Sequence, residues 1–207
     1  QKHEEMSENV ETIELEIKDE LQDGTFALSL VNRPAIESDF VALSEDSGSD
    51  SITFSAVDDD RNIVVGFALI PDIIIPRNQD GKRFNVTMSK ETVAKSAELF
   101  LKNHNNSNVT TEHKKPVKDC CVIESWIVED PKNDKSNVYN LNPKGGEWVV
   151  MMKLYNEEEY QKAKRGEYKG FSIEGMYKGM DKINQSKEEE DSDIINEILE
   201  TLNNITK

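Results

Sequence analysis

Apolar and polar positions alternate along the chain in two different periods, and together these periods predict most of its secondary structure. Strand-like runs, either alternating or continuously apolar between turn residues, occupy residues 52–57, 63–70, 83–88, 117–128, 147–155 and 168–177. Residues 25–43 are predicted to be extended chain interrupted at Asn32-Arg33-Pro34. Residues 71–82 contain two prolines and the turn pair Asp80-Gly81, which predict a connection. Residues 10–21 fit a strand and a helix equally well.

Two segments show the start signals of helices. Ser89 precedes a helical stripe that consists of Val93, Ala97, Phe100 and Leu101. Asn156 precedes a segment whose acidic residues come first and whose basic residues come last, an order that suits the helix dipole, and Gly166 ends it. Residues 191–205 predict a third, terminal amphipathic helix.

These elements predict an α+β fold, a mainly antiparallel β-barrel with connecting helices and acidic terminal extensions. The predicted division is an acidic extension over residues 1–23, a barrel domain over residues 24–180, and an acidic linker with a terminal helix over residues 181–207.

The charge of the chain is concentrated at its ends. The 207 residues include 41 acidic and 25 basic side chains, a formal net charge of −16, to which residues 1–23 contribute −7 and residues 186–207 contribute −5. An acidic surface repels phosphate backbones, so nucleic acid is not an expected partner. The longest apolar stretch, residues 63–75, is interrupted by Gly66, Pro71 and Asp72 and is too short for a membrane helix, so no membrane partner is expected either.

Few side chains suggest chemistry by themselves. Neither an HxxxH or CxxC spacing nor a P-loop or Rossmann glycine pattern is present, so no metal and no cofactor is predicted. The adjacent Cys120 and Cys121 would point to opposite faces of a strand, which argues against a structural disulfide and fits a reducing cytoplasm. Ser172 lies in the strand pattern Lys-Gly-Phe-Ser-Ile-Glu-Gly, where Glu174 would share its face. His113 follows another short strand-like segment, and from local sequence alone both residues could be ordinary surface positions.

Four segments together resemble a known family. They are IPDIIIPR at residues 70–77, TEH at 111–113 followed by VIESWIVED at 122–130, GGEWVVMMKL at 145–154, and KRGEYKGFSIEG at 164–175. In order and spacing they resemble the XkdF-type phage prohead proteases, relatives of the herpesvirus capsid-assembly protease.

The resemblance implies a serine endopeptidase that cleaves scaffold and major capsid precursor proteins inside the assembling procapsid, in the host bacterial cytoplasm. It implies Ser172 as nucleophile and His113 as general base, which agrees with the chemistry, because a serine hydroxyl needs a nearby imidazole to take its proton. The herpesvirus relatives use a second histidine after the serine, and none follows His113 here. Glu124 is the predicted third member, with Asp130 and Glu174 as the alternatives. Because the herpesvirus relatives are activated by dimerisation, the resemblance also raises a homodimer as one arrangement.

Two other hypotheses remain open at this point. One is a catalytically inactive scaffold or capsid-associated structural protein that keeps the protease fold. The other is a thiol nucleophile, Cys120 or Cys121, paired with His113. The acidic ends are either adaptors for shell partners or solvated tails.

Overall fold

The computed structural model describes residues 10–32, 56–58, 61–79 and 82–180. The predicted terminal helix, both acidic ends and residues 33–55 lie outside the described residues. The described strands are β1 (Thr12–Leu15), β2 (Gly24–Val31), β3 (Ala56–Asp58), β4 (Ile63–Leu69), β5 (Ile75–Gln79), β6 (Lys82–Met88), β7 (Val109–Thr111), β8 (Lys115–Pro116), β9 (Cys120–Ile127), β10 (Trp148–Leu154) and β11 (Gly170–Met176). The helices are α1 (Lys90–Lys102), α2 (Glu157–Lys164) and the short 3-10 turns η1 (Asn105–Ser107) and η2 (Lys135–Tyr139).

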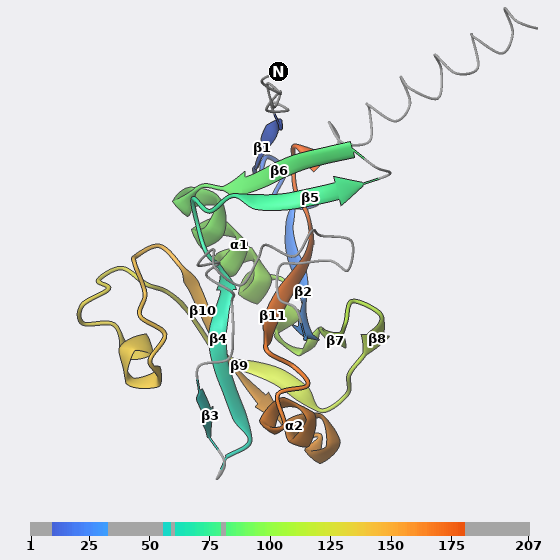
Figure 1. The fold of residues 1–207 in the computed structure, drawn as a ribbon, viewed down its shortest axis with the longest axis vertical. Coiled ribbons are helices and arrows are strands. Elements are labelled where there is room, and N and C mark those ends of the chain that lie inside the picture. The colour runs from blue at the N-terminus through green and yellow to red at the C-terminus, as the bar shows by residue number, and fades with distance from the viewer. Residues whose placement is uncertain (1–9, 33–55, 59–60, 80–81, 181–207) are drawn as a thin grey trace, which may run out of the picture.

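The described strands form three separate sheets (Figure 1). Their orders are β1-β6-β5, β3-β4-β10-β9 and β11-β2-β7-β8. Most neighbouring strands are antiparallel, but β1 pairs with β6 and β2 pairs with β7 in parallel. The α+β class is therefore confirmed, whereas the described strands do not close into the predicted barrel. Within the described part of the chain, the outer strands of each sheet have no further hydrogen-bonded neighbour. The three sheets are therefore held together by side-chain packing and not by a closed ring of strands.

Local patterns predicted the helices well. The Ser89 hydroxyl accepts a hydrogen bond from the Thr92 amide at 3.3 Å, and the Asn156 side chain caps α2 by accepting one from the Glu159 amide at 3.2 Å. Of the predicted stripe on α1, Val93, Ala97 and Phe100 are buried, but Leu101 is 46% exposed.

Two strand predictions need correction or completion. Residues 75–79 were predicted to lie in a connection, yet they form β5 at the edge of its sheet, where Pro76 needs no ladder partner on its open side. Residues 12–15, which fitted either element, form β1, because pairing with β6 buries Ile13 and Leu15 on one face.

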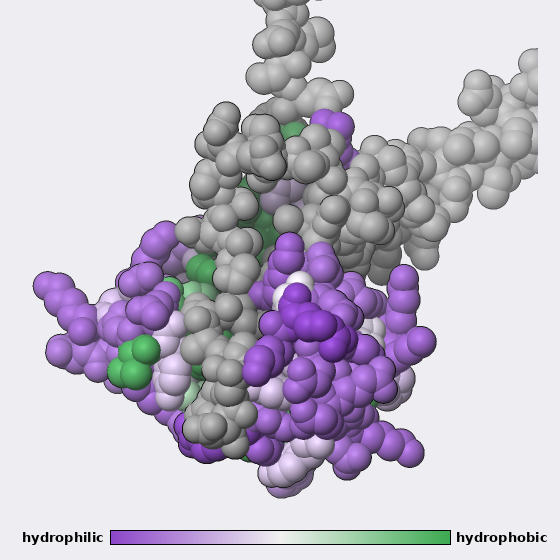
Figure 2. All heavy atoms as spheres, turned by 60° about the horizontal axis from the view of Figure 1, so that its bottom comes forward, coloured by the Kyte–Doolittle hydropathy of each residue, from purple (hydrophilic) through white to green (hydrophobic). Residues whose placement is uncertain are grey.

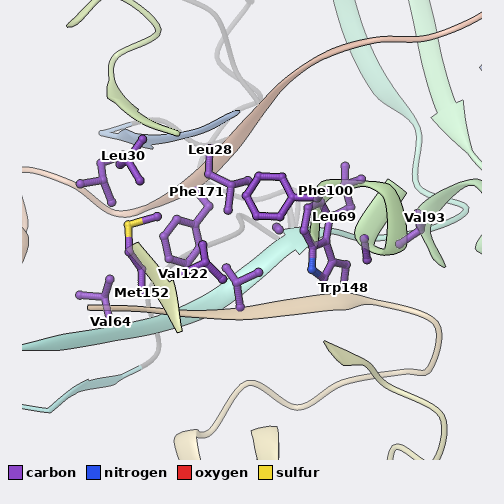
Figure 3. Packing of buried hydrophobic residues seen from close by; sticks show 14 of the residues in the cluster. Leu28, Leu30, Val64, Leu69, Val93, Phe100, Val122, Trp148, Met152 and Phe171 are labelled. Atoms are coloured by element: carbon purple, nitrogen blue, oxygen red, sulfur yellow. The ribbon is translucent and has the colours of Figure 1, made fainter. Parts of the chain in front are cut away.

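One hydrophobic cluster joins all three sheets and α1. Phe100 of α1 packs edge-on against Trp148 of β10, with ring centroids 5.3 Å apart. Figure 3 shows Phe171 of β11 among Leu28, Val122 and Met152 of the neighbouring strands. A second cluster covers the other face of β4 and β10, and burial on both faces explains why these strands are continuously apolar in sequence. Phe171 is fully buried, so alternation turns the next residue, Ser172, to the opposite face of β11.

Candidate active site

Ser172 lies on a strand whose neighbours carry two further hydroxyl side chains. In the antiparallel pair of β11 and β2, Ser172 stands opposite Ser29, and in the parallel pair of β2 and β7, Ser29 stands beside Thr110. Residues opposite one another in neighbouring strands share a face, with Cβ atoms about 5 Å apart. Ser172, Ser29 and Thr110 therefore form a row across three strands. Ser29 is fully buried, while Ser172 is partly exposed.

His113 is placed by a tight turn between β7 and β8. The Lys114 amide donates to the Thr111 carbonyl at 3.0 Å, and the two central residues, Glu112 and His113, have φ values of 48° and 55°. Both therefore adopt the left-handed region, which costs a non-glycine residue roughly 1 kcal/mol or more. Positive φ at both central residues is typical of a type I′ hairpin turn, whose twist matches that of the flanking strands, and further contacts hold this turn as well.

Those contacts come from β2 and the residue after it. The His113 amide donates to the Ser29 hydroxyl at 2.9 Å, and the Glu112 amide donates to the Leu30 carbonyl at 3.0 Å. The Glu112 carboxylate in turn accepts a hydrogen bond from the Asn32 amide at 2.6 Å. The strand beside Ser172 thus also holds the backbone of His113.

The imidazole of His113 lies against the carboxylate of Glu174. Its Nδ1 atom is 3.3 Å from Oε1 of Glu174, and the two side chains are 34% and 22% exposed. The Thr110 hydroxyl donates a hydrogen bond to the same carboxylate oxygen. Glu174 follows Ser172 by two residues and so shares its face of β11. A carboxylate at Nδ1 keeps the proton on that nitrogen and leaves Nε2 free to accept another.

The structure gives Glu124 and Asp130 other partners. Glu124, on β9 of a different sheet, forms an ion pair with Lys135, whose ammonium group also lies 4.0 Å from the centre of the Trp126 ring. Asp130 accepts hydrogen bonds from the Asn133 side chain and the Lys132 amide, and the Asn133 bond is the main reason that the pKa of Asp130 is lowered. The excursion that contains Asp130 and Lys135 lies on the left of Figure 1, and the β7–β8 hairpin lies on the right. The contact with His113 belongs to Glu174, which the sequence offered only as an alternative.

Near the end of β11, Gly175 lies unusually close to the backbone of β2. A Cβ atom added to Gly175 would lie 2.5 Å from the carbonyl oxygen of Gly24. Gly175 therefore permits the pairing of β11 with β2 at a point where the register shifts. The small residue brings the two strands of the site together.

Ser29 and Thr110 are the site residues that the sequence did not identify. The available signal at Ser29 was a single hydroxyl within the apolar strand Ala-Leu-Ser-Leu-Val. Such a residue needs a hydrogen-bond partner when buried, but the sequence cannot name that partner.

Cys120 is poorly suited to act as a nucleophile. Burial, with a smaller contribution from the charge of Glu159, raises the pKa of the Cys120 thiol to about 12. The reactive thiolate is therefore strongly disfavoured at neutral pH. Cys121, next to it on β9, donates to the Val122 carbonyl at 3.4 Å and accepts from the Asn106 side chain at 3.8 Å.

Within the described residues, no group of three or more His, Cys, Asp or Glu side chains could hold a metal ion. No helix in the same ranges is both long enough and apolar enough to cross a membrane.

Comparison with known proteins identifies the family. The model of the family described as "Putative phage serine protease XkdF" matches residues 51–181, more than half of the chain. The protein therefore belongs to this phage protease family. No curated protein and no solved structure matches it. The match contains His113, Ser172 and Glu174, but it begins after β2, which lies between β11 and β7 in the sheet.

Proposed function

We propose that this protein is a serine endopeptidase in which Ser172 is the nucleophile, His113 the general base, and Glu174 the carboxylate that orients His113. The observation that carries the proposal is the 3.3 Å contact between Nδ1 of His113 and Glu174, two residues from Ser172 on the same face of β11. In this assignment Glu174 takes the role that the sequence gave to Glu124.

The residues support the following reaction. The hydroxyl oxygen of Ser172 attacks the carbonyl carbon of the scissile peptide, and its proton passes to Nε2 of His113. The tetrahedral intermediate then releases the amine, which takes that proton from the imidazolium, and an acyl-enzyme remains. Water attacks the ester, again with His113 as base, and frees Ser172. Glu174 stabilises the imidazolium in both halves without itself becoming protonated.

We further propose that the substrates are scaffold and capsid precursor proteins, cleaved inside the assembling procapsid in the host cytoplasm. Membership of a phage serine protease family supports a role in the phage cycle. The relation to the herpesvirus capsid-assembly protease and a dimeric active form stay predictions that follow from the resemblance.

The test is co-expression with the cognate scaffold and capsid proteins, followed by mass measurement of the fragments. Ser172→Ala should abolish cleavage, because in this assignment the Ser172 hydroxyl forms the acyl-enzyme, while the circular dichroism spectrum stays unchanged. Ser107→Ala, an exposed serine of η1, is the matched control and should cleave normally. Full processing by Ser172→Ala would overturn the assignment. Absence of cleavage by the unaltered protein would favour the inactive structural protein instead.

A further inference from the structure

A pocket of about 770 Å³ lies next to His113. Its lining includes Glu112 and Lys114, the two chain neighbours of His113. One wall is the β7–β8 hairpin with the segment after it, and the other wall comes from α2 and its flanks. The polar residues that characterise it are Lys114, Lys115 and Lys118 on the first wall and Asn156, Lys162 and Tyr168 on the second. The volume is in the usual range of ligand pockets, about 300–1,000 Å³. We call this the basic pocket.

The carboxylates of the basic pocket already have partners within the protein. Lys162 lies 2.9 Å from both Glu158 and Glu159, and Tyr168 donates to Glu159 at 2.6 Å. The bond to Lys162 lowers the pKa of Glu158, as expected for a paired carboxylate. Glu112, the third carboxylate, accepts from the Asn32 amide. Lys162 balances only one of these charges, so the four lysines and three carboxylates that line the pocket sum to a net charge of +1.

The lysines of the hairpin wall are in the opposite situation. Lys114, Lys115 and Lys118 are exposed, and among the described residues none of them forms an ion pair with a carboxylate. These three ammonium groups therefore lie in one pocket without a neutralising carboxylate among the described residues. Figure 2, in which the lower part of Figure 1 is turned forward, shows that the described surface here is predominantly hydrophilic. The occupant of such a pocket should therefore be polar and anionic.

The sheet register sets the position of the basic pocket relative to the nucleophile. Ser172, Ser29 and Thr110 lie across three neighbouring strands, which are about 4.8 Å apart, so Thr110 is roughly 10 Å from Ser172. The pocket lies at the β8 edge of this sheet, because Pro116, the partner of Thr110 in β8, lines it, together with Thr111, whose side chain belongs to the other face of β7. An extended peptide advances about 3.3 Å per residue, so this distance corresponds to roughly three to five residues of substrate.

We infer that the basic pocket is a specificity subsite that binds acidic side chains of the substrate, roughly three to five residues from the scissile bond. This inference rests on the proposed function, because it assumes that a peptide is cleaved at Ser172. Unpaired lysines select acidic sequences by direct ion pairing and by attracting them to the site.

The decisive experiment measures binding separately from cleavage. The full-length Ser172→Ala variant is titrated into two fluorescein-labelled decapeptides that differ only in three central residues, Glu in one and Gln in the other. We expect at least tenfold tighter binding of the Glu peptide in low salt. Lys114→Gln/Lys115→Gln/Lys118→Gln should reduce that preference to less than twofold.

The control variant loses the same charge elsewhere. Lys18→Gln/Lys102→Gln/Lys132→Gln alters three exposed lysines outside the pocket and should keep the preference. Equal binding of the two peptides, no binding of either at 1 mM, or a preference that survives the pocket substitutions would each overturn the inference.

A degenerate peptide library cleaved by the unaltered protein separates the two proposals. An enrichment of acidic residues a few positions from the cleaved bond would support both proposals. Lys→Glu changes at the three pocket positions should then turn this preference into one for basic residues. Cleavage without acidic preference would overturn the subsite and leave the protease assignment intact. A preference in binding together with no cleavage of any library member or of the precursor proteins would overturn the protease assignment and the role of the pocket in cleavage, and would leave only the binding of acidic peptides to the pocket.

Discussion

At the scale of single residues, the identity of the carboxylate beside His113 is the main result. Glu124 and Glu174 are both partly exposed acids on strands, but their neighbours differ. Glu124 is paired with Lys135, a contact between exposed side chains that contributes little to stability. Glu174 touches Nδ1 of His113 and accepts a hydrogen bond from the Thr110 hydroxyl, so it is fixed against the imidazole.

Substituting each of these two carboxylates should therefore have very different effects on activity. Glu174→Gln should lower kcat by about 10²–10⁴-fold, because the amide neither holds the required tautomer nor stabilises the imidazolium. Glu124→Gln, the matched control, should change kcat less than twofold. Steady-state cleavage of a capsid-precursor peptide measures both. A loss of activity in Glu124→Gln with retained activity in Glu174→Gln would reverse the assignment.

A second prediction at this scale concerns Cys120 and the stability of the folded protein at alkaline pH. Its pKa is about 12 in the folded protein and near its ordinary value of 9.0 when unfolded. Between these values the unfolded state releases the proton and the folded state keeps it. The stabilising contribution is thus complete below pH 9 and falls by up to about 1.4 kcal/mol per pH unit above it.

Urea unfolding at pH 8, 9, 10 and 11 measures this contribution. Cys120→Ala should be less stable at pH 8, because a buried group is lost, and its stability should fall less steeply with pH than that of the unaltered protein. Cys121→Ala, which alters the partly exposed neighbour, should keep the steep fall. Parallel pH profiles for all three proteins would contradict the prediction.

At the scale of elements, β2 organises the site. It lies between β11 and β7, and it supplies the hydroxyl and the carbonyl that hold the strained turn of His113. The start of β2 is fixed as well, since the hydroxyls of Thr25, Ser96 and Tyr177 bond to one another at 2.6–2.8 Å. This buried triangle joins β2 to α1 and to the residue after β11.

Removing the Ser29 hydroxyl should therefore loosen the turn. Ser29→Ala leaves the His113 amide without its acceptor and should cost about 1–2 kcal/mol of unfolding free energy. It should also lower kcat more than it raises KM, because the base is displaced while the substrate surface is retained. Ser107→Ala again serves as control in urea unfolding and kinetics. An unchanged kcat in Ser29→Ala would show that the turn does not depend on this bond.

At the scale of the whole molecule, the packed core extends beyond the segment that the family model matches. The match covers residues 51–181, whereas β1 and β2 precede it and contribute to the common core and the site. Ile13, Leu15, Leu28 and Leu30 are all buried. Without these two strands, the edges of β6, β7 and β11 that pair with them would be open to water.

A chain comprising residues 51–181 should therefore not fold as the intact protein does. We expect it to bind a hydrophobic dye, to unfold without a cooperative transition and to cleave nothing, because apolar surface is lost and β11 has no partner. A chain comprising residues 10–181 is the control and should unfold cooperatively in urea. Cooperative unfolding and activity of the shorter chain would contradict this view of the domain.

The sequence by itself determined most local elements and the family resemblance, and through that resemblance it supplied His113 and Ser172 as candidate site residues. Periodicity and capping residues act over a few positions, so α1, α2, β4, β6, β10 and β11 could be predicted from them. The resemblance in four segments predicted a phage serine protease family, which the family match confirms.

Only the tertiary structure decided which strands lie together and therefore which carboxylate meets His113. The contact of His113 with Glu174, the bond of its amide to Ser29, and the three open sheets in place of a barrel all join residues far apart in the chain. Such pairings depend on which apolar faces pack in the common core, and local patterns do not encode that choice. Alternation could place Glu174 on the face of Ser172, but only the parallel pairing of β2 with β7 brings His113 to it.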